Sequence, residues 1–173
     1  MASFIGADYR LCSHAMKDVL PEAIELLRQL VNMESPSYDK ALADVCGRFV
    51  AERFEAIGGR IEIVPDGRFG DHVLARFGSS SETPLILLGH IDTVFPKGEI
   101  EKRPFTVNGS RATGPGVFDM KGGIVLMWMA MRQLGHRHNV TVLLTSDEEV
   151  GSNASRALIE YGQSFFSCTS NCP

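Results

Sequence analysis

The residues with the clearest chemical potential are His90 and Asp92, which directly follow the apolar run 85–88. That run predicts a strand that is buried on both faces. Because side chains two positions apart in an extended chain point to the same side, we expect the imidazole and the carboxylate to lie together. A histidine that binds a metal through one ring nitrogen needs a partner for the other nitrogen, and Asp92 can supply it. An isolated His-x-Asp pair is more often the end of a strand than a site, so the argument needs further residues.

Carboxylates follow or precede two further apolar segments. Asp119 lies in GPGVFDMKGG before a predicted helix at 122–134, and Glu148 and Glu149 follow a predicted buried strand at 140–145. Open α/β sheets bind ligands outside the carboxyl ends of their strands. These three carboxylates are therefore expected to meet the histidine in one crevice.

A cluster of one imidazole and several carboxylates repels itself in the absence of a cation. A divalent metal relieves that repulsion, and mixed nitrogen and oxygen ligands suit Zn²⁺, with Co²⁺ or Mn²⁺ as alternatives. Asp119 is suited to bridge two metals. Of the adjacent Glu148 and Glu149, one can bind metal while the other takes a proton from water, whose pKa a metal lowers to about 7. The pattern thus favours metal-dependent hydrolysis.

Other chemistries lack their motifs in this sequence. The glycines of GPGVFDMKGG match neither the phosphate loop nor the dinucleotide-binding pattern, and there is no Gly-x-Ser-x-Gly nucleophile motif. His136 and His138 have the spacing of metal ligands, but they precede the predicted strand at 140–145, at the opposite end from Glu148. We expect a solvated turn at the two histidines.

Composition and charge indicate a soluble globular domain or a piece of a larger one. The chain has 173 residues and a net charge of −4 without a long block of either sign, so neither nucleic acid nor an anionic membrane is expected as a partner. The first residues contain no signal-peptide core, and the longest apolar run, 124–131, is shorter than the roughly 20 residues that cross a bilayer. We expect a cytoplasmic location, with reduced thiols at Cys12, Cys46, Cys168 and Cys172.

Hydrophobic periodicity predicts an α/β fold. Residues 1–17 are expected to be frayed or disordered, with Pro21 in the first turn of the helix that follows. The long segment 93–116 is expected to be irregular, with a short strand at 105–107. The predicted helices are 18–33, 38–57, 122–134 and 151–161, and the predicted strands are 61–64 and 72–77, both toward a sheet edge, with 85–91 and 140–145.

Three segments in register resemble a known family. GHIDTVFP, GPGVFDMKGG and TSDEEVGS resemble, in order and spacing, the dizinc peptidases and deacylases that include acetylornithine deacetylase, succinyl-diaminopimelate desuccinylase, aminoacylase and bacterial glutamate carboxypeptidase. The resemblance covers residues 18–162, which correspond to the N-terminal part of that family's catalytic domain. It implies a three-layer fold with a mixed, largely parallel sheet and helices on both faces.

The resemblance also implies a role for each candidate residue. His90 would bind one zinc ion and Glu149 the other, Asp119 would bridge both ions, Asp92 would orient His90, and Glu148 would be the general base. A cis peptide bond would follow Asp119. The implied substrates are N-acyl amino acids or short peptides, and the ending TVFP of the first motif is closest to the glutamate carboxypeptidase branch.

The sequence departs from the family pattern after Glu160. The resemblance implies two further ligands and a smaller dimerisation domain, but residues 161–173 contain no Asp, Glu or His. We therefore expect a truncated catalytic domain with an atypical tail at 163–173, and the oligomeric state stays open. Three interpretations remain: a zinc-dependent amide hydrolase, a non-catalytic metal-binding remnant or interaction protein, and a chain whose missing ligands come from another subunit.

Overall fold

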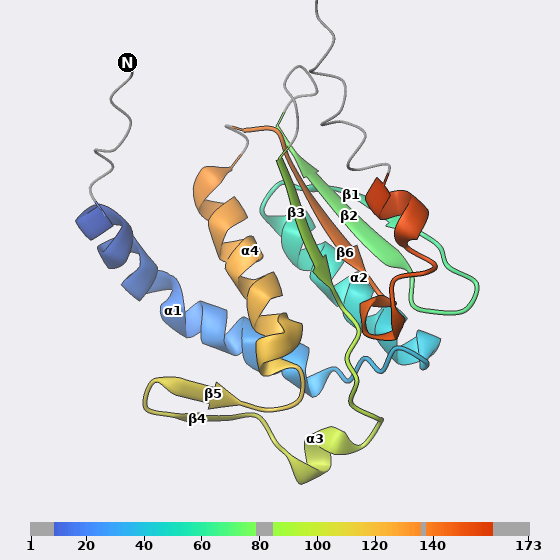
Figure 1. Ribbon diagram of the computed structural model, residues 1–173. Helices are drawn as coiled ribbons and strands as arrows, with labels where there is room; N and C mark the ends of the chain where they lie inside the picture. The colour runs from blue at the N-terminus through green and yellow to red at the C-terminus, as the bar shows by residue number, and fades with distance from the viewer. Residues whose placement is uncertain (1–8, 79–84, 136–137, 161–173) are drawn as a thin grey trace, which may run out of the picture.

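The computed structural model describes residues 9–78, 85–135 and 138–160, and within this part a four-stranded sheet forms the centre (Figure 1). The order of the strands across the sheet is β1-β2-β6-β3. Their bounds are β1 Arg60–Val64, β2 His72–Phe77, β3 Leu85–His90 and β6 Val140–Thr145. The strands predicted at 72–77 and 140–145 are confirmed to the residue, and the other two differ from their predictions by one residue at one end.

The sheet is mixed, as predicted, but the expectation that it is largely parallel is wrong for the described strands. β1 pairs with β2 and β2 with β6 in antiparallel fashion, and only β3 and β6 are parallel. The physical reason lies in the connections: a short segment joins β1 to β2, whereas the long connection from β3 to β6 includes a helix that crosses over. The parallel pair is the one that matters for function, because it brings the carboxyl ends of β3 and β6 to the same edge.

The prediction that β3 is buried on both faces is also wrong. Leu85 and Leu88 are 55% and 48% exposed. The cause is the position of the strand, because within the described residues β3 pairs only with β6 and so lies at an edge of the sheet. β1 lies at the other edge, as predicted, whereas β2 is an inner strand.

Two of the three long helices contact one face of the sheet, and the first packs against the third. The three are α1 (Tyr9–Asn32), α2 (Lys40–Ala56) and α4 (Gly122–Leu134). The Trp128 indole N–H donates to the Arg53 carbonyl over 3.0 Å and so joins α4 to α2. The buried side chains that these helices share with the sheet include Leu26, Leu30, Val50, Phe54, Ile124, Trp128, Val73, Ala75, Phe77, Val140, Val142 and Leu144.

The expected arrangement with helices on both faces is therefore present only in part. In Figure 1 the short helical segment 156–160 lies on the side of the sheet away from α4. The helix predicted at 151–161 begins later than expected, because a 3-10 turn, Glu148–Val150, and further turns come first. Among the described helices, none is long and apolar enough to cross a membrane.

The first two helices start at other residues than predicted. α1 begins at Tyr9 rather than Asp18, and Pro21 lies inside the helix instead of in its first turn. A proline inside a helix removes one backbone hydrogen bond, which is why it suggested a helix start. α2 begins at Lys40, after Asp39 accepts a hydrogen bond from the Leu42 amide over 3.1 Å as its N-cap.

The segment between β3 and α4 contains more structure than the one short strand that was predicted. It forms the short helix α3 (Glu99–Lys102) and a hairpin of β4 (Thr106–Asn108) and β5 (Arg111–Thr113). The Glu34 carboxylate accepts hydrogen bonds from the amides of Gly98, over 2.8 Å, and Ile100, over 3.0 Å. These bonds tie the start of the segment to the end of α1.

Lys121 fixes the turn that carries Asp119. Its side chain is 2% exposed, and its ammonium donates to the carbonyls of Leu30, over 2.9 Å, and Met33, over 2.6 Å. Burial lowers the pKa of Lys121. The Leu30 carbonyl belongs to the last turn of α1 and the Met33 carbonyl directly follows it, at the helix end where the dipole favours a cation. The turn Val117–Lys121 is thereby held against α1.

Replacement of Lys121 by methionine tests whether its hydrogen bonds to Leu30 and Met33 stabilise the fold. Lys121→Met keeps most of the side-chain volume but leaves two buried carbonyls without their donor, which we expect to cost about 1–3 kcal/mol in the free energy of unfolding. Urea denaturation measures the cost. Lys102→Met, at an exposed lysine on α3, is the matched control and should change stability by less than about 0.5 kcal/mol. Equal midpoints for the two variants would contradict the role of Lys121.

Candidate metal centre

His90 stands at the carboxyl end of β3 with its two ring nitrogens in different surroundings. Nδ1 lies 2.9 Å from the carbonyl oxygen of Asp92 and 3.4 Å from its carboxylate. Nε2 lies 3.0 Å from Oδ1 of Asp119 and 3.8 Å from Oε2 of Glu148. Nε2 is therefore the nitrogen that faces the neighbouring carboxylates.

Asp92 is fully buried and accepts hydrogen bonds from two other segments. The Ser37 hydroxyl donates to it over 2.6 Å, and the amides of Glu148 and Glu149 each donate over 3.2 Å. Burial raises the pKa of Asp92, but the hydrogen bonds from His90, Ser37 and the Glu149 amide outweigh it, so the pKa lies below its usual value. Asp92 is thus an anion that holds the loop after β6 against β3.

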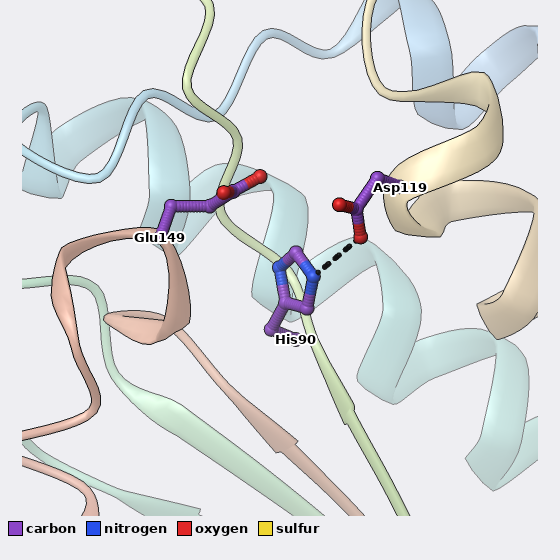
Figure 2. A group of neighbouring side chains, drawn as sticks. All are labelled: His90, Asp119 and Glu149. Carbon is purple, nitrogen blue, oxygen red and sulfur yellow. Dashed lines mark hydrogen bonds and ion pairs between the residues drawn. The ribbon is translucent and has the colours of Figure 1, made fainter.

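Three side chains from three segments converge beside this carboxylate. His90, Asp119 and Glu149 offer ligand atoms that all lie within 4.8 Å of one another. Figure 2 shows the three side chains directed toward a shared space, with His90 on β3, Asp119 before α4 and Glu149 after β6. Glu148 follows β6 as well, and its carboxylate is half exposed to solvent at the edge of the group. All five residues that the sequence singled out therefore lie at one edge of the sheet.

Burial and neighbouring charges shift the pKa values of His90 and Glu149. Burial lowers the pKa of His90, but the hydrogen bonds to Asp92 and Asp119 outweigh it and raise the pKa to about 9. Burial also raises the pKa of Glu149, and the carboxylates of Asp119 and Asp92 add to this effect against the attraction of His90. Without a metal, the imidazolium thus partly offsets the crowding of carboxylates.

The donor set fits a divalent metal. Zn²⁺ binds histidine nitrogens and carboxylate oxygens at about 2.0–2.2 Å, so ligand atoms around one ion lie roughly 3–4 Å apart. The spacing within 4.8 Å comes close to that value, and the Asp119 side chain is 68% exposed and free to adjust. A metal would also replace the proton of His90 as the partner of these carboxylates.

Met120 brings the Asp119 turn close to β3. Its sulfur lies 3.2 Å from the His90 amide, which donates to it. A Cβ on Gly89 would come within 2.8 Å of the Met120 methyl carbon, so a larger residue there would displace the end of the Met120 side chain. The peptide bond between Asp119 and Met120 is cis, as the family resemblance implied.

Two supporting residues were not recognised from the sequence. Ser37 directly precedes the predicted helix at 38–57, and its hydroxyl donates to Asp92. Asp147 is fully buried, and its carboxylate accepts from the amides of Ala154, over 2.8 Å, and Ser155, over 3.2 Å, which shapes the loop after β6. The signal for Asp147 was present, since it precedes the two glutamates directly after a buried strand.

Of the other histidines, His72 lies at the same edge of the sheet but faces Ser146, whose hydroxyl is 3.2 Å from its Nδ1. His138 is exposed and precedes β6, whose other end carries the cluster, and His136 lies outside the described residues. Cys46 is a buried free thiol, and burial raises its pKa. Cys168 and Cys172 also lie outside the described residues.

Several curated proteins are similar to this chain in sequence. Carboxypeptidase G2 from Pseudomonas sp. (strain RS-16) is 33% identical over 153 residues, which cover 84% of this chain and 37% of the relative. Acetylornithine deacetylase from Salmonella arizonae is 32% identical over 157 residues, 84% of this chain and 41% of the relative. Succinyl-diaminopimelate desuccinylase from Methylococcus capsulatus is 35% identical over 145 residues, 78% of this chain and 36% of the relative. The chain spans well under half the length of these relatives.

Solved structures share the fold. Human carnosine dipeptidase 1 matches with a TM-score of 0.72 and 22% identity over 89% of this chain and 38% of that structure. The M20 family metallo-carboxypeptidase Sso-CP2 from Sulfolobus solfataricus matches with a TM-score of 0.69 and 21% identity over 83% of this chain and 35% of that structure. The sequence model of peptidase family M20/M25/M40 matches residues 86–170, which contain all five candidate residues. Together with the relatives, this match confirms the resemblance of the three motifs: the chain belongs to peptidase family M20/M25/M40.

Proposed function

We propose that His90, Asp119 and Glu149 bind divalent metal, with zinc as the first choice, and that the protein uses this metal to hydrolyse amide bonds. The observation that carries the proposal is the convergence of these three side chains within 4.8 Å at the carboxyl ends of β3 and β6. Relatives named carboxypeptidase and deacetylase support N-acyl amino acids or short peptides as substrates. The chain spans 37% and 41% of those relatives, so the activity of a whole protein is part of the proposal.

The geometry supports one assignment of ligands over others. Because Nδ1 of His90 is engaged by Asp92, Nε2 is the nitrogen left for a metal. Asp119 has two carboxylate oxygens and lies within 4.8 Å of the ligand atoms of both His90 and Glu149, so in a two-metal centre it would bridge, while His90 and Glu149 would each bind one ion. Asp92 would keep the imidazole in the orientation that presents Nε2, as carboxylate partners of metal-bound histidines do.

Glu148 is our choice for the general base. When bound, zinc lowers the pKa of water to about 7 and polarises the scissile carbonyl. Glu148 then accepts a proton from the attacking water, whose oxygen bonds to the carbonyl carbon. As the carbon–nitrogen bond breaks, Glu148 returns the proton to the leaving nitrogen, which gives a carboxylic acid and an amine. The position of Glu148, with its carboxylate 3.8 Å from Nε2 and half exposed to solvent, suits this transfer.

A non-catalytic role in metal binding or protein interaction is the second candidate. It is favoured by β3, which pairs with a single strand in the described part of the chain and exposes Leu85 and Leu88. An unpaired strand edge with exposed apolar side chains favours association with another chain. In this case metal would bind without turnover.

Hydrolysis by the zinc-loaded chain of 173 residues, tested on N-acyl amino acids and dipeptides, separates the candidates. Glu148→Gln should lower the rate by about 10²- to 10⁴-fold, the usual contribution of a general base, and leave the zinc content unchanged. Glu52→Gln, an exposed glutamate on α2, is the matched control and should keep the full rate. Zinc without turnover in the parent chain would favour the second candidate, and an undiminished rate in Glu148→Gln would rule out its role as base.

The pH dependence of metal binding gives a second test. Because its pKa is about 9, His90 carries a proton at pH 7, and a metal on Nε2 must displace it. Affinity should therefore rise with pH and level off above about pH 9, with about one proton released from His90 per bound metal at pH 7. Calorimetry in two buffers of different protonation enthalpy counts the protons. Binding that is independent of pH between 6.5 and 9 would contradict this account.

A further inference from the structure

A pocket of about 470 Å³ opens directly beside the cluster of candidate metal ligands His90, Asp119 and Glu149. Three segments line it: residues 36–39 before α2, residues 93–97 after β3, and Glu149 with Val150 after β6. Glu149 therefore belongs both to the candidate metal ligands and to the wall of the pocket. Any molecule whose reacting bond lies at the metal has this pocket as its neighbour.

The walls of the pocket are fastened to the same residues that build the cluster. Asp92 accepts hydrogen bonds from Ser37 on one wall and from the Glu149 amide on another. The Thr93 amide donates to the Ser35 carbonyl over 2.9 Å, and the Ser35 hydroxyl donates to the Ile91 carbonyl over 2.8 Å. The distance between the pocket and the cluster is thus fixed by buried hydrogen bonds.

The lining of the pocket is mostly apolar. Tyr38 and Val94 are 70% and 65% exposed, and Phe95, Val150 and two prolines complete the apolar surface. The Tyr38 ring packs against the Phe69 ring, with 5.9 Å between the two ring centroids. Large apolar side chains that face solvent around a concave surface mark a binding site rather than a folding requirement.

We propose that this pocket binds a bulky apolar group, aliphatic or aromatic, that is attached next to the scissile amide of the substrate. The inference deepens the proposed function and rests on it for the position of that amide. The volume is within the range of small-molecule sites and far exceeds what an acetyl group fills. A substrate with a large apolar substituent therefore displaces water from the apolar surface of the pocket, whereas an acetylated substrate leaves most of that surface hydrated. The substrate with the large substituent is bound more tightly than the acetylated one.

The test compares benzamide with acetamide, two neutral amides that differ in this group, on the metal-free chain of 173 residues labelled with ¹⁵N. Benzamide should shift the amide signals of residues 37–39, 93–95 and 150, and it should bind at least about tenfold more tightly than acetamide, given the apolar area of a ring. Val94→Asp places a charge in the apolar wall and should weaken benzamide binding by about tenfold or more.

Val107→Asp is the matched control, because Val107 is an exposed valine on the β4/β5 hairpin outside the pocket. It should leave benzamide binding unchanged. Tyr38→Ala is a second pocket variant without added charge, and it should also weaken benzamide binding. Equal affinities for the two amides, shifts outside the pocket, or equal effects of Val94→Asp and Val107→Asp would overturn the proposal.

The two proposals fail separately in this design. Benzamide binding involves neither metal nor turnover. A failure of benzamide to bind would therefore remove the pocket assignment and leave the proposal of amide hydrolysis untouched. Conversely, benzamide binding in a chain that takes up no zinc would support the pocket while it removes the proposed metal chemistry.

Discussion

The buried carboxylate of Asp92 is the constraint on which the rest of the site depends. A charge without access to water must be satisfied by hydrogen bonds, or folding becomes costly by several kcal/mol. Asp92 meets this demand with the Ser37 hydroxyl, the His90 imidazole and the amides of Glu148 and Glu149. Each of these partners is fixed in place because it satisfies the charge. The same bonds orient the imidazole and set one wall of the neighbouring pocket.

Strand pairing and the crossover connection place the other residues of the cluster. The parallel pairing of β3 with β6 sets His90 opposite Thr145, so that the loop with Glu148 and Glu149 begins beside the histidine. The crossover between these strands returns through the turn before α4, which Lys121 ties to the end of α1. Asp119 therefore approaches from a third direction (Figure 2). The resulting group has donors of two kinds and an excess of negative charge, and a divalent cation is the natural complement.

Strong local patterns allowed accurate predictions from the sequence. α4 and β6 have apolar runs bounded by glycine or by a sudden change to acid, and their bounds were predicted to the residue. The errors concern neighbours rather than local preference: an apolar run such as 85–88 does not reveal whether strands flank it on both sides. Likewise, the sequence could not tell that the long helices lie on the same side of the sheet, since that depends on which connections cross over. The role of Ser37 was hidden because the contact with Asp92 spans 55 residues.

The most direct test of the account is the zinc content of the purified chain after dialysis against buffered zinc, measured by elemental analysis beside Glu149→Ala. The account predicts stoichiometric zinc in the parent chain and a clear loss in the variant, since Glu149 supplies one of the three converging donors. Glu52→Ala, on the exposed side of α2, should retain the zinc of the parent. Parent zinc no higher than that of Glu149→Ala would contradict the central claim that this cluster binds metal.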